Sequence, residues 1–136
     1  PVIAACSGHA VALGTFLLCC CDYRIGVKGE FMLGANEMRT NMVIPTPILE
    51  LIKFRVSNAH KYRAVLGAEM YTLEDSLAAG LMDEVVDQNL LMSAVNEKAK
   101  DLATMGHPSY SMTKELFIAD PMSKINTAME ELKNNS

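Results

Sequence analysis

Residues 1–27 carry the pattern that decides the fold: PVIAACSGHAVALGTFLLCCCDYRIGV. Within them, residues 2–6 form a short apolar run that begins with β-branched side chains, which predicts a strand buried on both faces. Residues 14–21 predict an apolar helix, and residues 22–27 predict a second strand. A strand, a helix and a strand in so short a segment form a βαβ unit, so we expect a parallel sheet.

The remaining sequence is mostly helical in pattern. A third extended segment is expected at residues 31–33, and a small strand at residues 83–87. Apolar spacing, capping residues and stop signals predict helices over residues 47–54, 57–66, 72–80, 90–104, 109–118 and 121–133. Ser57, Thr72 and Asp120 are the residues expected to begin three of these helices.

Composition fits one folded domain of 136 residues, because 50% of them are hydrophobic and only 21% are charged. We expect a single α/β domain with a short parallel sheet in residues 1–44 and a helical region in residues 45–136. The net charge of −4 and the lack of a basic stripe argue against nucleic acid as a partner. Residues 1–21 hold no Asp, Glu, Lys or Arg, but a Ser-Gly-His turn interrupts them, so no membrane insertion is expected.

The four cysteines are Cys6, Cys19, Cys20 and Cys21. Three consecutive cysteines do not share one helix face, and none has a partner further along the chain. This spacing fits neither a disulfide framework nor a zinc site. We therefore expect reduced thiols, a cytoplasmic protein and no metal site.

Four motifs in order carry a resemblance to a known family. They are PVIAACSGHA with Gly14 and CDYRI (residues 1–25), GANEM (34–38), LGAEMY (66–71) and AAGLMDEVV (78–86). With them the chain resembles the crotonase superfamily, the enoyl-CoA hydratases and isomerases. The resemblance implies a ClpP/crotonase-type spiral of ββα repeats followed by a helical C-terminal region. It covers only the second half of such a fold, so the first half, with much of the CoA pocket, is expected before Pro1.

The resemblance also implies chemistry through a thioester enolate, whose oxyanion needs preorganised N–H donors. The family's donor position corresponds to the backbone N–H of Leu13, beside Gly14, at the start of the first helix. The free N–H groups and the dipole of a helix N-terminus favour an anion there. The alternative is an ordinary buried turn whose amides are bonded internally.

A base must then move a proton at carbon, and the resemblance identifies Glu37 in the Asn-Glu motif. Hydratases of the family use two glutamates, and the first of these positions holds Phe16 here. One carboxylate suffices to move a proton from C2 to C4, so the pattern is closest to the single-glutamate Δ3,Δ2-enoyl-CoA isomerases. The alternative for Glu37 is a surface carboxylate at a strand end. The expected acyl pocket consists of Ala12, Phe16, Met42 and Ile44.

These interpretations predict an acyl-CoA thioester as substrate, with coenzyme A as part of that substrate and no other cofactor. A homo-oligomer, a trimer or hexamer, is expected from the family. Lys114 falls where the family often has a basic residue near CoA phosphates, whereas His9 is expected to be a packed turn residue. A non-catalytic, truncated crotonase-fold module that oligomerises or binds a partner is the alternative function. A hydrolase is disfavoured because the Gly-x-Ser-x-Gly elbow is absent around Ser7.

Overall fold

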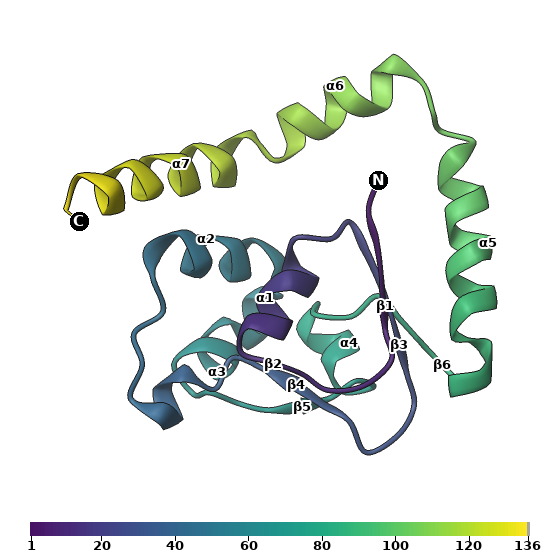
Figure 1. The fold of residues 1–136 in the computed structure, drawn as a ribbon, viewed down its shortest axis with the longest axis horizontal. Coiled ribbons are helices and arrows are strands. Elements are labelled where there is room, and N and C mark those ends of the chain that lie inside the picture. Colours follow the sequence, from purple (N-terminus) through teal and green to yellow (C-terminus); the bar gives the residue numbers. More distant parts are fainter. Residues whose placement is uncertain (136) are drawn as a thin grey trace.

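The computed structural model describes residues 1–135 as an α/β fold with a long helical C-terminal arm (Figure 1). Its strands are β1 (Ile3–Cys6), β2 (Ala10–Val11), β3 (Tyr23–Val27), β4 (Met32–Gly34), β5 (Tyr71–Thr72) and β6 (Glu84–Val86). Its α-helices are α1 (Leu13–Cys19), α2 (Thr46–Arg55), α3 (Lys61–Val65), α4 (Ser76–Ala79), α5 (Leu91–Ala103), α6 (Pro108–Phe117) and α7 (Ala119–Asn134). Short 3₁₀ turns are η1 (Glu37–Thr40), η2 (Asn58–His60) and η3 (Gln88–Leu90).

The strands form two small sheets. One three-stranded sheet has the order β1-β3-β6, and both of its pairings are parallel, which confirms the expected parallel sheet. The other has the order β2-β4-β5, with β2 parallel and β5 antiparallel to β4. Figure 1 shows the β2-β4-β5 sheet beneath α1. Because β2 and β5 have two residues each, no alternation of apolar and polar residues marks them in the sequence.

The first strand differs from its prediction. β1 lies at the edge of its sheet, with β3 as its only neighbour among the described strands. Ala5 is exposed, while Ile3 and Ala4 are half-buried and Cys6 is buried. The expectation of a strand buried on both faces is therefore wrong, because α5 packs against one side of this sheet and leaves Ala5 uncovered.

Several helix ends also differ from the prediction. α1 stops at Cys19, and Arg55 donates from its Nε to the Cys19 carbonyl and from its Nη2 to the Cys21 carbonyl, both at 2.8 Å. Ser57 holds the N-cap position of η2, as expected, but its side chain makes no capping bond, because its Oγ donates to the Ala78 carbonyl at 3.1 Å instead. The Thr72 hydroxyl accepts the Asp75 N–H at 3.0 Å, as a cap would, but it closes a turn and α4 begins only afterwards.

The C-terminal arm consists of α5, α6 and α7, and α7 packs across α2 (Figure 1). α7 begins at Ala119, ahead of the expected start at Pro121. Pro121 fits there because residues in the first turn of a helix need no intrahelical acceptor for their N–H. No helix within residues 1–135 combines the length and the apolar character needed to cross a bilayer.

The main core lies between α1, α2 and the β2-β4-β5 sheet. Its fully buried side chains include Leu33, Ile52 and Leu73. A second cluster of Ile25, Val27 and Leu91 fills the space between β3 and α5. The main core includes Ala10 of β2 and Ala35, which follows β4, so it anchors both of these segments.

Candidate active site

The turn between β2 and α1 is strained. Ala12 has φ 52° and ψ −114°, a region that residues with a Cβ rarely adopt. Its N–H donates to the Gly34 carbonyl at 2.9 Å, and its carbonyl accepts the Phe16 N–H at 3.2 Å. Leu13 is then the first residue of α1, where N–H groups have no acceptor within the helix. The Leu13 side chain is 65% exposed, so it points away from the core.

Gly34, at the end of β4, lies against a second loop of the chain. A Cβ added to Gly34 would come within 2.8 Å of both the Glu69 carbonyl oxygen and the Met70 sulfur. Only glycine therefore permits this close approach of the loop over residues 67–70. The same loop accepts a hydrogen bond at the Ala68 carbonyl from Arg39 Nε, at 3.0 Å. Loop 67–70 thus supports both ends of the segment that carries Glu37.

Glu37 is buried, with 7% of its surface exposed, and it begins η1. The alternative of a surface carboxylate is wrong. Its Oε2 is fully enclosed, and no group in residues 1–135 donates a hydrogen bond to it. Its backbone carbonyl is bonded by the Met42 N–H at 2.9 Å and by the Thr40 hydroxyl at 3.1 Å. A rigid backbone thus presents a buried carboxylate with one oxygen left without a partner, which is unusual because buried charged groups are normally paired.

Thr15 joins the α1 turn to the strand that leads to Glu37, and the sequence patterns did not identify it. It is fully buried, and its hydroxyl donates to the Ala10 carbonyl at 2.6 Å while accepting the Gly34 N–H at 2.9 Å. Both backbone polar groups of Gly34 are therefore bonded to the start of α1. A Thr in the first turn of an apolar helix is the only sequence signal, since a buried hydroxyl needs partners.

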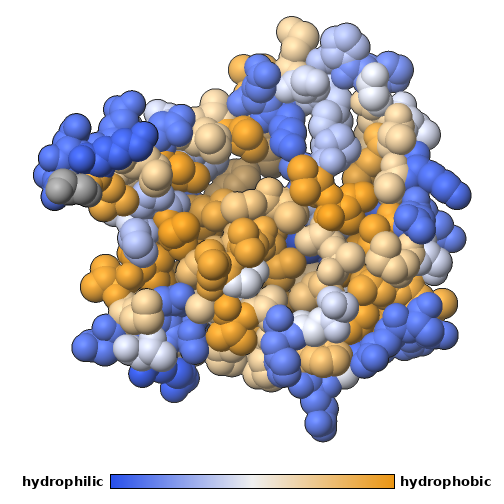
Figure 2. Space-filling model, viewed as in Figure 1, coloured by the Kyte–Doolittle hydropathy of each residue, from blue (hydrophilic) through white to orange (hydrophobic). Residues whose placement is uncertain are grey.

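The four residues expected to form an acyl pocket differ in how far they are buried. Phe16 and Ile44 are buried in the main core cluster. Ala12 is half-buried, and Met42 is 59% exposed. Other large apolar side chains are exposed on or next to the elements that carry Leu13 and Glu37, namely Leu17 on α1, Met38 on η1 and Val43 in the segment after η1. Figure 2 shows apolar side chains gathered across the centre of one face, with charged residues around its edge.

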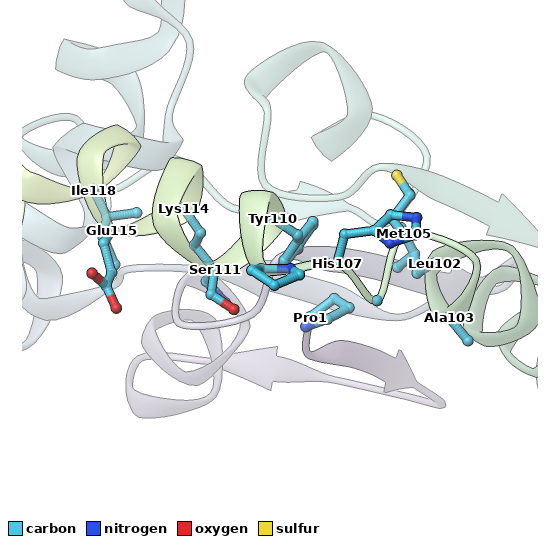
Figure 3. Close-up of a pocket in the computed structure, with 12 residues that line it drawn as sticks. Pro1, Leu102, Ala103, Met105, His107, Tyr110, Ser111, Lys114, Glu115 and Ile118 are labelled. Carbon is cyan, nitrogen blue, oxygen red and sulfur yellow. The ribbon is translucent and has the colours of Figure 1, made fainter.

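Two large cavities lie away from Glu37. One of about 660 Å³ lies where Pro1 meets His107, Tyr110 and neighbouring residues at the start of α6 (Figure 3). The other, of about 430 Å³, lies between α2 and the α6–α7 arm, where the surface is hollowed (Figure 2). Neither is lined by Leu13 or Glu37. Both cavities are instead lined in part by residues of the C-terminal arm.

Lys114 and His9 have structural partners. Lys114 Nζ donates to Asp22 Oδ2 at 2.7 Å, and the Val2 N–H donates to the same oxygen at 2.7 Å. Burial alone would raise the pKa of Asp22, but these two hydrogen bonds outweigh it and hold that pKa below its usual range. His9 Nδ1 accepts the Met32 N–H at 3.1 Å, and its ring packs edge-on against Phe31, as expected for a packed turn residue.

The cysteines are all free thiols within the described residues. Cys6 and Cys19 are buried, Cys20 is exposed and Cys21 is intermediate. Burial raises the pKa of Cys19 to about 12, although Arg24 and Arg55 oppose the shift. No cluster of three or more His, Cys, Asp or Glu side chains suited to a metal ion is found in residues 1–135.

Comparison with known proteins shows which family the chain matches. The sequence profile described as enoyl-CoA hydratase/isomerase matches residues 1–135. A family protein of that description from Pseudomonas syringae is 37% identical, with a TM-score of 0.93 over 96% of this chain and 57% of its own. An enoyl-CoA isomerase from Mycobacterium tuberculosis is 32% identical, with a TM-score of 0.92 over 100% of this chain and 60% of its own.

A curated relative is named as a hydratase. The (E)-benzylidenesuccinyl-CoA hydratase of Thauera aromatica is 26% identical over 115 residues, which are 85% of this chain and 44% of that protein. The chain thus spans about half the length of the proteins it matches. Because the relatives include a hydratase and an isomerase, these similarities leave the choice between the two reactions open.

Proposed function

Because the chain belongs to the enoyl-CoA hydratase/isomerase family, we propose that the protein binds acyl-CoA thioesters and converts a 3-enoyl thioester to its 2-enoyl isomer. The observation that carries this proposal is Glu37, a buried carboxylate whose Oε2 has no hydrogen-bond donor within residues 1–135. Its segment is tied through Gly34 to the first turn of α1. A base and an N–H donor held by one framework are what enolate chemistry requires.

In the proposed reaction, Glu37 removes a proton from C2 of the substrate. The electron pair of that C–H bond moves into the thioester, and negative charge develops on its oxygen. The backbone N–H of Leu13, with that of Gly14, would donate to this oxygen. The protonated Glu37 then returns the proton to C4, and the double bond lies between C2 and C3. One carboxylate thus serves as base and then as acid.

Isomerisation is preferred to hydration because of Phe16. Addition of water by the two-glutamate route needs a second carboxyl on α1, and the corresponding position holds an apolar side chain that is buried in the core. No carboxylate lies on α1, whose sequence is LGTFLLC. The exposed apolar side chains of Leu13, Met38 and Met42 would contact the acyl chain. The proposed acyl pocket also includes Ala12, Phe16 and Ile44, which would form its floor.

The test compares the whole protein with its Glu37→Gln variant on a short-chain 3-enoyl-CoA and a 2-enoyl-CoA. Isomerisation is followed by the conjugated product and hydration by loss of that absorbance. Glu37→Gln should lower the kcat of isomerisation by about 10²–10⁴-fold, because the amide does not accept the proton. Glu97→Gln, on the exposed face of α5, is the matched control and should leave kcat unchanged.

Two results would contradict the proposal. Wild-type turnover in Glu37→Gln would remove Glu37 from the reaction. Hydration of the 2-enoyl-CoA faster than isomerisation of the 3-enoyl-CoA would make the protein a hydratase.

The same proposal includes a homo-oligomer, a trimer or hexamer. It also includes no cofactor beyond the CoA of the substrate.

A further inference from the structure

The Thr15 hydroxyl connects the two halves of the proposed site. It lies on the first turn of α1, two residues after Leu13, and it is fully buried. It accepts the Gly34 N–H at 2.9 Å, and Gly34 is followed by Ala35, Asn36 and Glu37. Its proton is donated to the Ala10 carbonyl at 2.6 Å, on the strand that precedes the strained turn. One side chain therefore bonds to the backbone on both sides of the site.

We propose that Thr15 is a positioning residue that sets Glu37 relative to the first-turn N–H groups of α1. This proposal rests on the proposed function. The Ala12 N–H also holds the Gly34 carbonyl, so Gly34 is fixed by both of its polar groups. Ala12 acts through the backbone, which substitution does not remove, whereas the Thr15 bond depends on its side chain. Thr15 is thus the part of this link that mutation tests directly.

The Thr15 link matters because the Glu37 segment has little other support from α1. The remaining hydrogen bonds around it lie within η1 or reach loop 67–70 through Arg39. Loss of the Thr15 acceptor would free the Gly34 N–H and let the β4 end shift away from α1. A displacement of about 1 Å between a base and an oxyanion donor is enough to cost a large part of the rate.

The experiment measures kcat and KM of the whole protein for Thr15→Val and Thr15→Ser, each with Glu37 and with Glu37→Gln. Valine keeps the shape and removes the hydroxyl, and serine keeps the hydroxyl. With Glu37 present, Thr15→Val should lower kcat by about 10-fold to 100-fold with little change in KM. In the Glu37→Gln background the same change should alter kcat less than about threefold, because the group it positions is gone. Thr15→Ser should retain kcat, and Thr127→Val on exposed α7 is the matched control.

A second readout is independent of turnover. The Gly34 amide should exchange with deuterium at least about tenfold faster in Thr15→Val than in Thr15→Ser, because only valine leaves it without an acceptor. If Thr15→Val does not fold, Thr15→Cys takes its place, since sulfur is a weak acceptor and should give an intermediate kcat.

The outcomes separate this proposal from the proposed function. Equal losses of kcat from Thr15→Val in both backgrounds would make Thr15 merely structural and overturn its positioning role. Wild-type kcat in Thr15→Val, alongside a strong loss in Glu37→Gln, would overturn only the Thr15 proposal. Wild-type kcat in Glu37→Gln would overturn both.

Discussion

Replacing Ala12 with glycine should stabilise the protein, although an alanine-to-glycine change normally does the reverse. Ala12 is held at φ 52° and ψ −114°, where its Cβ is crowded by its own backbone. Such conformations cost on the order of 1–3 kcal/mol for a residue with a side chain, and glycine adopts them freely. Both backbone groups of Ala12 are hydrogen-bonded, so the turn keeps its shape after the change.

The expected size follows from the opposing costs. Glycine gives the unfolded chain more freedom, which costs about 0.4–1 kcal/mol, and the half-buried methyl group contributes roughly 0.4 kcal/mol by burial. We expect a net stabilisation of about 1 kcal/mol, which corresponds to a rise in Tm of about 4 °C for a chain of this size. Ala99→Gly, on the exposed face of α5, should instead lower stability by about 1 kcal/mol.

Urea denaturation followed by circular dichroism measures both variants. Ala12→Gly should raise the midpoint and Ala99→Gly should lower it, with the same slope m for both and for the wild type. If Ala12→Gly lowers the midpoint as far as Ala99→Gly does, the turn stores no strain, and the reasoning from its dihedral angles fails.

Two further predictions concern titratable groups. Iodoacetamide at pH 8 should alkylate the exposed Cys20 at least about tenfold faster than Cys19, because burial raises the Cys19 pKa to about 12, and mass mapping that gives equal rates would contradict this. Asp22→Asn should lower Tm at neutral pH, since it removes the carboxylate that holds Lys114 and the Val2 N–H. The folded-state pKa of Asp22 is lowered, so its stabilisation should be complete above the unfolded value of ~3.9 and lost as pH falls through the folded value. A Tm difference between wild type and Asp22→Asn that persists undiminished at pH 2 would refute the assignment.

Much of the fold was predictable because its signals are local and strong. The apolar runs that became β1 and β3 paired in parallel, and the strand expected at residues 83–87 formed as β6. The Asn-Glu motif pointed to Glu37, but its burial and the packing of loop 67–70 against Gly34 and Arg39 are tertiary features that no local pattern encodes.

The failures have a common physical origin. Ser57 has the right side chain for a helix cap, yet a carbonyl from a distant helix competes for its hydroxyl. Thr15 looks like one polar residue in an apolar helix until Gly34 is brought beside it. In both cases the partner is supplied by tertiary structure, and propensity describes only the residue itself.

The sequence separations of the tethers also set an order for assembly of the native chain. Thr15 and Gly34 are 19 residues apart, whereas Arg24 and Asp83 are 59 apart, and Lys114 and Asp22 are 92 apart. Closing the longest of these loops costs about 1.4 kcal/mol more chain entropy than closing the shortest. Contacts of low separation form sooner in folding. We therefore expect the framework around Glu37 to form early, and α6 and α7 to dock last on a scaffold that already fixes the Glu37 segment.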